Sequence, residues 1–292
     1  MAASMVEPSP EPPANRVPRV AHFVFGLRPQ SEPFHLVHYL AIESCRRMLR
    51  PTAIQMHHKH LPWGLWWDRI RPHLTLVEVD EAPEVRSATY DDRLVPEQYR
   101  YAHHADFVRL DALIEHGGVY ADIDTLFLAP FPDDLFRASF VIGDEGPQLD
   151  EVTGQWRPSL CNALMMAEPG ADYARAWRQR MARELNGTWS NHSGFLAATL
   201  AGEMPGRVRV EPPRTFLPAP CSVEGLRDLL ERDATDVRGA VSLHLWEHLW
   251  WQAERVDFTT VHAGRITAEW VRTAPTTYAR LARPFLPEID VW

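Results

Sequence analysis

Two aspartates one residue apart, Asp122 and Asp124, end the stretch that most constrains how this chain can fold. Before them, Ala102–Glu115 carries apolar residues at helical spacing and predicts a helix with one face on a core. Gly117 and Gly118 would end that helix, because the residue past the last turn often needs a left-handed backbone. The next three residues, Val-Tyr-Ala, predict a short buried strand. Open α/β sheets bind ligands beyond the carboxyl ends of their strands, so this pattern predicts an α/β fold with a site at the two aspartates.

The chemistry of the pair favours a metal site. On extended chain, side chains two residues apart lie on one face, so we expect both carboxylates to point the same way. Like charges at close range raise each other's pKa unless a cation lies between them. Hard divalent ions such as Mg²⁺ and Mn²⁺ prefer carboxylate oxygens and often bind substrate phosphates as well. Isolated Asp-x-Asp pairs are more often turn or cap residues, but apolar segments flank this one on both sides, which places it inside a folded domain.

The whole pattern resembles a known family. Ala105-Asp106-x-x-Arg109 followed by Gly117-Gly118-Val119-Tyr120-x-Asp122-x-Asp124 is similar to the DXD-containing sugar-nucleotide glycosyltransferases of glycosyltransferase family 32. Relatives of that family include α-mannosyltransferases, α-1,4-galactosyltransferases and the glucosylating domains of large clostridial toxins. The resemblance implies a GT-A-type, Rossmann-like fold, in which helices flank a mixed, mainly parallel sheet. We expect a single large domain over residues 19–292.

The resemblance also implies roles for individual residues. It makes a divalent ion, Mn²⁺ or Mg²⁺, the cofactor and a nucleotide sugar the donor. It implies that the catalytic residues are Asp106, Arg109, Asp122 and Asp124. It implies that the donor is bound by Val24, Phe25, Asp106, Arg109, Gly118, Tyr120 and Asp122. The metal ligands would be Asp122, Asp124 and one histidine near the C-terminus, with His244 preferred over His248.

The remaining patterns agree with this architecture. Strands are predicted at Arg19–Phe25, Pro51–Met56 and Leu74–Val79, with a helix at His35–Leu49, which gives a parallel β-α-β-α-β start. Further on, two strands and a surface helix are predicted, at Ser139–Ile142, Asn162–Met166 and Ala171–Leu185.

Composition limits the environment and the partners. Met1–Pro18 is rich in proline with almost no large apolar residue, which predicts a disordered tail. No signal peptide or apolar run of membrane-spanning length occurs in the sequence. The net charge of −9 and the lack of a basic run argue against nucleic acid as a partner. Three widely spaced cysteines predict reduced thiols, hence a cytoplasmic protein, with peripheral membrane association left open.

Four other interpretations remain open. His244-x-x-Glu247-His248 matches the inverted zinc-protease motif, which needs both histidines on one helix face. Asp122-Ile-Asp124-Thr125 matches the first motif of haloacid-dehalogenase-type phosphatases, although those enzymes use a later lysine and Lys59 is the only one here. The histidine-rich run 57–60 could bind a metal but lacks paired ligand spacing. A non-catalytic nucleotide-sugar-binding module could share the same fold.

The sequence therefore predicts a metal-dependent glycosyltransferase that uses a UDP- or GDP-sugar and retains the anomeric configuration. The acceptor is open: a glycan, a lipid-linked glycan, a protein or a small molecule. The full set of acidic and arginine residues favours an enzyme over a binding module.

Overall fold

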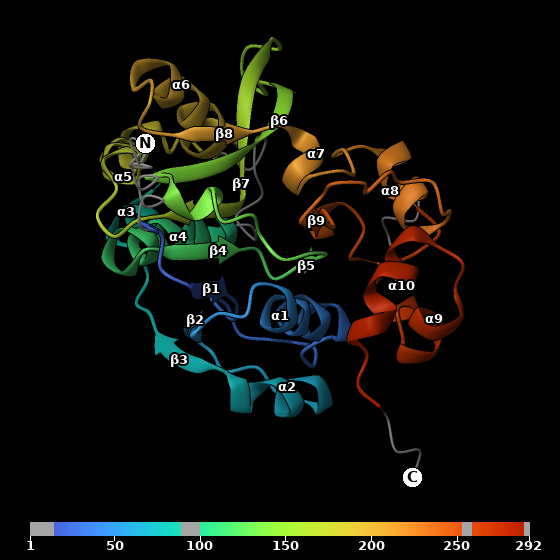
Figure 1. Ribbon diagram of the computed structural model, residues 1–292. Coiled ribbons are helices and arrows are strands. Elements are labelled where there is room, and N and C mark those ends of the chain that lie inside the picture. The colour runs from blue at the N-terminus through green and yellow to red at the C-terminus, as the bar shows by residue number, and fades with distance from the viewer. Residues whose placement is uncertain (1–14, 89–99, 253–258, 289–292) are drawn as a thin grey trace, which may run out of the picture.

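A computed structural model describes residues 15–88, 100–252 and 259–288. Its main sheet has seven strands in the order β3-β2-β1-β4-β7-β6-β8 (Figure 1). β1, β2, β3 and β4 are parallel, β7 is antiparallel to both β4 and β6, and β8 is parallel to β6. These strands are Val20–Val24 (β1), Ala53–His58 (β2), Thr75–Glu78 (β3), Gly118–Ala121 (β4), Phe140–Leu149 (β6), Trp156–Ala167 (β7) and Arg209–Glu211 (β8). The predicted mixed, mainly parallel sheet is confirmed.

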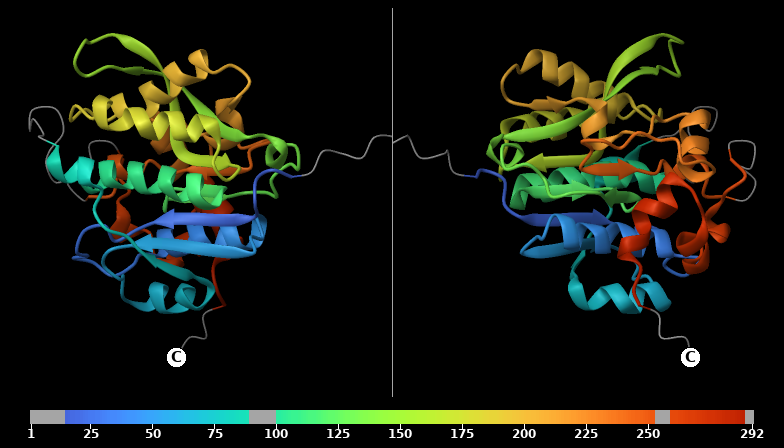
Figure 2. Two further views of the ribbon diagram at one scale, coloured as in Figure 1. Left: turned by 90° about the vertical axis from the view of Figure 1, so that its left-hand side faces the viewer. Right: turned by 45° about the vertical axis from the view of Figure 1, so that its right-hand side comes forward.

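A separate two-stranded sheet pairs β5 (Thr125–Phe127) with β9 (Ser242–His244). Helices lie on both faces of the main sheet (Figure 2). The α-helices in the described ranges are Leu36–Met48 (α1), Leu65–Ile70 (α2), Pro83–Ser87 (α3), Arg100–His116 (α4), Asp172–Glu184 (α5), Leu196–Glu203 (α6), Pro213–Phe216 (α7), Val223–Leu230 (α8), Ala268–Thr273 (α9) and Thr277–Ala282 (α10).

Successive side chains of β4 point to opposite faces of the sheet and pack into two separate parts of the core. Val119 and Ala121 pack into the cluster that includes α1, whereas Tyr120 packs into the cluster that includes α4 and α5. This is the period of two expected of a strand buried on both sides. α4 ends where the sequence predicts, since Gly117 has φ +62° and its N–H donates to the Leu113 carbonyl at 2.9 Å.

The later elements differ in length from the prediction. β6 and β7 extend well past the predicted ranges 139–142 and 162–166, and they continue as a paired hairpin out to Leu149 and Trp156. This hairpin projects from the top of the molecule in Figure 1. Its outer half is more polar and exposed, so the apolar pattern that predicted the strands stops before the backbone pairing does.

The folded part also begins before residue 19. Arg16 pairs with Glu168 at 2.6 Å, and the side chain of Val17 is 2% exposed. The end of the predicted tail therefore belongs to the folded chain, because one ion pair and one apolar anchor attach it to the strand-turn region near Phe136 and Glu168. Residues 1–14 lie outside the described residues.

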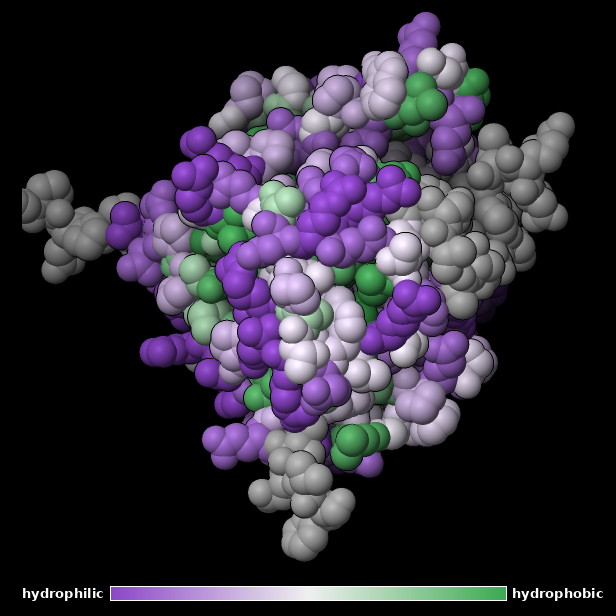
Figure 3. Space-filling view, turned by 90° about the vertical axis from the view of Figure 1, so that its right-hand side faces the viewer, coloured by the Kyte–Doolittle hydropathy of each residue, from purple (hydrophilic) through white to green (hydrophobic). Residues whose placement is uncertain are grey.

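No helix in the described ranges is long and apolar enough to cross a membrane. On the face that carries α8, α9 and α10, hydrophilic side chains predominate and apolar ones are scattered among them (Figure 3).

Candidate active site

The two aspartates lie in a turn between β4 and β5. The Asp122 N–H donates to the Ala163 carbonyl on β7 at 2.7 Å, and the Thr125 N–H donates to the Asp122 carbonyl at 2.9 Å. The expectation that the carboxylates share one face of an extended strand is therefore wrong in its geometry. The turn itself brings both side chains to the carboxyl end of the sheet, beside β9.

The pairing of β5 with β9 brings a distant histidine to this turn. Thr125 pairs with His244, so the imidazole lies next to Asp124, 120 residues away in the chain. His244 Nε2 is 3.1 Å from Asp124 Oδ1 and 3.8 Å from Asp122 Oδ2. One ligand atom from each of the three residues lies within 4.8 Å of the others, which is a set that could hold a metal ion. The donors are two carboxylates and one imidazole, as predicted for Asp122, Asp124 and His244.

A strained residue follows His244 and completes the site. Trp246 has φ +54° and ψ +47°, a left-handed conformation that costs an aromatic residue about 1–3 kcal/mol. Its indole N–H donates to the Ala219 carbonyl at 2.9 Å, which holds the side chain in the core. The turn directs the backbone N–H of Glu247 back to Asp124 Oδ2 at 2.8 Å. The strain thus serves to fix the orientation of one carboxylate.

Burial and neighbouring charge separate the pKa values of the two aspartates. Burial alone would raise the pKa of Asp124, but His244 and the Glu247 amide lower it to about 2. For Asp122 burial dominates, and its pKa is raised despite the nearby Arg109. Burial disfavours the charged form of His244, yet Asp124 and Asp122 raise its pKa. The cluster therefore concentrates negative charge that a cation would stabilise.

A cavity of about 850 Å³ opens beside this cluster. Most of the predicted site residues line it: Val24, Phe25, Arg109, Tyr120, Asp122, Asp124 and His244. His248 and three tryptophans, Trp189, Trp246 and Trp251, also contribute to its wall. A large cavity with a few convergent charged groups is typical of a small-molecule site.

Comparisons with known proteins agree with this geometry. Residues 49–141 match the family model described as a glycosyltransferase sugar-binding region containing a DXD motif. The chain is also 30% identical, over 283 residues, to glucan organizing enzyme 1 of Cryptococcus neoformans var. grubii serotype A. That alignment covers 94% of this chain and 72% of the relative. The chain belongs to this glycosyltransferase family.

Solved glycosyltransferases are similar in structure but distant in sequence. GlyE of Streptococcus pneumoniae TIGR4 is 12% identical with a TM-score of 0.45, covering 90% of this chain and 66% of GlyE. Galactosyltransferase LgtC, solved with donor and acceptor sugar analogs, is 14% identical with a TM-score of 0.42, covering 86% of this chain and 98% of LgtC.

In this glycosyltransferase, Arg109 joins the cluster of Asp122, Asp124 and His244 to α4. Its Nη1 lies 3.3 Å from Asp122 Oδ1 and donates to the Asn162 carbonyl at 3.0 Å. Its guanidinium stacks over the ring of Tyr120 at 4.7 Å, and the Tyr120 hydroxyl donates to Asp122 Oδ1 at 2.5 Å. One oxygen of Asp122 is therefore held by protein groups, while Oδ2 faces His244.

Asp106 and Gly118 are the two predicted donor-binding residues that do not line the cavity. Asp106 lies behind Arg109, with its Oδ1 3.2 Å from Arg109 Nη2. Gly118 starts β4 at φ +108°, and a Cβ there would come within 2.4 Å of the Val20 carbonyl oxygen. The geometry thus explains Gly118 by close packing of β4 on β1 rather than by contact with a ligand.

The zinc-protease pattern does not have the geometry that it requires. His244 lies in strand β9, and His248 follows the left-handed residue Trp246 in a short 3₁₀ helix, Glu247–Leu249. The two histidines therefore do not share a helix face. The ring of His248 packs near Trp189, with centroids 5.1 Å apart.

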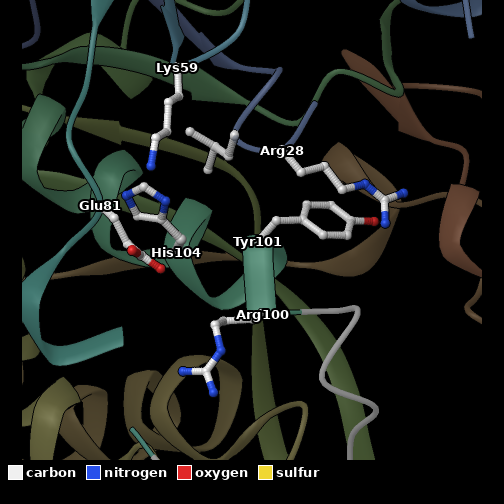
Figure 4. A pocket seen from close by; sticks show the side chains of 7 residues that line it. Arg28, Lys59, Glu81, Arg100, Tyr101 and His104 are labelled. Carbon is white, nitrogen blue, oxygen red and sulfur yellow. The ribbon is translucent and has the colours of Figure 1, made fainter. Parts of the chain in front are cut away.

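A second, smaller cavity of about 210 Å³ adjoins the first (Figure 4). Leu27, Arg28 and Tyr101 line both, and the smaller cavity adds Lys59, Glu81, Arg100 and His104. The Arg28 guanidinium lies 4.1 Å from the centroid of the Tyr101 ring.

Several contacts at the site could not be predicted from the sequence. Asn162 Nδ2 donates to Asp106 at 2.8 Å, and His192 Nε2 lies 2.8 Å from the other Asp106 oxygen. On the opposite wall, Glu247 accepts from His38 Nε2 at 2.9 Å, and both line the cavity. A lone histidine on an apolar helix or an asparagine in a strand gives no spacing from which such a contact could be predicted.

Proposed function

We propose that this glycosyltransferase transfers a sugar from a nucleotide-sugar donor, UDP- or GDP-linked, with the help of Mn²⁺ or Mg²⁺ and with retention of configuration. The observation that carries the proposal is the convergence of Asp122, Asp124 and His244 on one point at the edge of a large cavity.

The donor atoms of the cluster fit a divalent cation. Asp122 Oδ2, Asp124 and His244 Nε2 lie together, and His244 Nδ1 is buried without a hydrogen-bond partner among the described residues. When bound, the ion supplies positive charge that offsets the charge developing on the departing diphosphate. Mg²⁺ sites in proteins are built from oxygen, whereas Mn²⁺ accepts an imidazole more readily, so this mixed set favours Mn²⁺.

The protein groups around the cluster hold it in position for this chemistry. Tyr120 and Arg109 fix one oxygen of Asp122, and the Glu247 amide fixes one oxygen of Asp124. Each aspartate is thereby oriented before any ligand arrives, which reduces the reorganisation needed during the reaction. Arg109 also borders the cavity. There its guanidinium can form hydrogen bonds with hydroxyl groups of the nucleotide sugar, as the family resemblance implies.

We propose an orientation for the donor from the residues that line the cavity. Phe25 packs against Phe34 and His38, with ring centroids 5.1 Å and 4.8 Å away, and forms an apolar wall with Val24. We place the nucleotide base there, the diphosphate at Asp122 and Asp124, and the sugar toward Arg109.

The acceptor remains a separate question. The name of the fungal relative refers to glucan, which makes a glucan-type glycan the first acceptor to test, ahead of lipid-linked, protein and small-molecule acceptors.

All three cysteines are free, and Cys45 and Cys161 are buried, which supports our proposal of a cytoplasmic location.

The test is a screen of purified protein against nucleotide sugars, with Mn²⁺-dependent hydrolysis as the readout, because it needs no acceptor. Hydrolysis of one donor that stops on chelation and returns with Mn²⁺ is expected. Tight binding of a donor with neither hydrolysis nor transfer to any acceptor would instead support a nucleotide-sugar-binding module.

A further inference from the structure

We propose that His192 is a positioning residue of the sugar subsite, acting through Asp106 on Arg109. This inference rests on the proposed function, because it assumes that Arg109 contacts the donor sugar. His192 is fully buried and does not line the cavity. Its Nε2 lies 2.8 Å from Asp106 Oδ2.

The ring of His192 is fixed in place from several sides. It lies in a single π-helical turn, Asn191–Phe195, and its carbonyl accepts from the indole N–H of Trp177 at 3.0 Å. The ring packs edge-on against His103, with centroids 4.6 Å apart, and lies nearly parallel to Phe107. Nδ1 has no hydrogen-bond partner among the described residues, so Asp106 supplies the polar contact that orients the imidazole.

The proton on this hydrogen bond can be assigned from the chemistry of the partner. Burial alone would raise the pKa of Asp106, but Arg109 and His192 lower it, so the carboxyl is ionised and can only accept. His192 Nε2 therefore carries the hydrogen and donates it. This is a charge-assisted hydrogen bond in a buried setting, which is stronger than a neutral pair.

Asp106 has both oxygens engaged away from the cavity. Oδ2 accepts from His192, while Oδ1 accepts from Asn162 and lies 3.2 Å from Arg109 Nη2. Arg109 in turn borders the cavity and reaches Asp122. The path from His192 to the ligand thus runs through one carboxylate and one guanidinium, both almost fully buried.

Loss of the hydrogen bond from His192 to Asp106 should affect one part of the donor more than the other. Without the His192 donor, Asp106 Oδ2 would be buried without its hydrogen bond, and the carboxylate would rotate or bind a proton. Arg109 Nη2 would then lose its contact with the Asp106 carboxylate. Outer residues that orient a site in this way typically contribute 10–100-fold to affinity or activity. The loss should weaken binding of the sugar and spare the nucleotide, because we place the diphosphate at Asp122 and Asp124, and Tyr120 still holds Asp122 Oδ1.

The experiment compares His192→Gln, His192→Asn and His192→Leu in the full chain with Mn²⁺ present. The amide nitrogen of Gln can reach Asp106 as Nε2 does, whereas that of Asn is too short. His22→Leu is the matched control, since His22 is equally buried but has no contact with the cavity. Binding of the nucleoside diphosphate and of the nucleotide sugar is measured for each by calorimetry, along with donor hydrolysis.

We expect His192→Leu and His192→Asn to weaken nucleotide-sugar binding by about 10–100-fold with nucleoside diphosphate binding unchanged, and His192→Gln to restore most of it. Wild-type nucleotide-sugar affinity in folded His192→Asn would overturn the inference, as would an equal loss for both ligands. If His192→Leu does not fold, the comparison of His192→Gln with His192→Asn still tests the inference. A wild-type protein that binds no nucleotide sugar would overturn the proposed function and this inference together.

Discussion

Two buried histidines, His22 on β1 and His244 on β9, have opposite charge preferences. His244 lies between Asp122 and Asp124, and these carboxylates raise its pKa despite its burial. His22, on β1, has no carboxylate partner within the described part of the chain: its Nε2 donates to the Gly117 carbonyl at 2.8 Å, and its Nδ1 lies 3.2 Å from His57 Nε2. Burial lowers the pKa of His22 to about 4. The neighbours, and not the depth, decide which histidine is charged.

The comparison separates a charged region of the molecule, around Asp124, from a neutral one, around His22. Around Asp124 the chain accumulates carboxylates, an arginine and a strained backbone, which is an expensive arrangement unless it binds a ligand. Around His22 and Gly118 the chain packs β1, β2 and β4 as closely as backbone allows. We therefore expect substitutions in the first region to affect activity and those in the second to affect stability.

The largest effect is expected for Asp124→Asn and Asp122→Asn. Each removes a negative charge from the cluster with almost no change in shape, so donor hydrolysis should fall by roughly 10³-fold. The melting temperature of Asp122→Asn should stay near or above that of the wild type, because burial and Asp124 disfavour the charge on Asp122. That of Asp124→Asn should fall, because the Asp124 carboxylate is stabilised by His244 and the Glu247 amide. Full activity in the double variant would contradict a metal role for the pair.

His244→Ala should have the next largest effect. It removes the only nitrogen ligand of the predicted set, so the concentration of Mn²⁺ needed for half-maximal donor hydrolysis should rise about 100-fold. The preference for Mn²⁺ over Mg²⁺ should shrink as well, since the remaining ligands are oxygens. Titration of both ions against wild type and variant measures this. His248→Ala is the control, and an equal change there would show that the ligand was assigned to the wrong histidine.

Gly118→Ala should act only through stability. The added Cβ would clash with the Val20 carbonyl oxygen and approach His22 Nε2 to 3.1 Å, at a φ that side chains avoid. We expect a loss of about 2–3 kcal/mol in the free energy of unfolding. Gly146→Ala is the control, since it has a similar positive φ with nothing within 4 Å of the added atom. A folded Gly118→Ala protein with weakened donor binding would restore the predicted ligand contact of Gly118.

Sequence patterns predicted the parts of the molecule that depend on local periodicity or on a contiguous motif. The β-α-β start, α4 with its glycine end, and the acidic pair follow from residues within about 30 positions. His244 was proposed only through family resemblance, because the register of β5 with β9 depends on packing that no local pattern encodes. The contacts of His192 and Asn162 to Asp106 could not be predicted from local patterns, since they span 86 and 56 residues.

The smallest effect that we expect is a pH-dependent change in stability caused by His22. In the unfolded chain the pKa of His22 returns to about 6.5, whereas in the folded protein it is about 4. Between these two pH values the unfolded state therefore binds a proton at His22 and the folded state does not. Stability should therefore fall as pH drops from 7 to 5, by about 2 kcal/mol for this residue. Denaturant unfolding of wild type and His22→Gln at both pH values measures the share of His22 and its contact with His57, because histidines away from this pair contribute equally to both proteins. The variant should lose less stability on acidification than the wild type. An identical loss in both proteins would mean that His22 is not the neutral counterpart of His244.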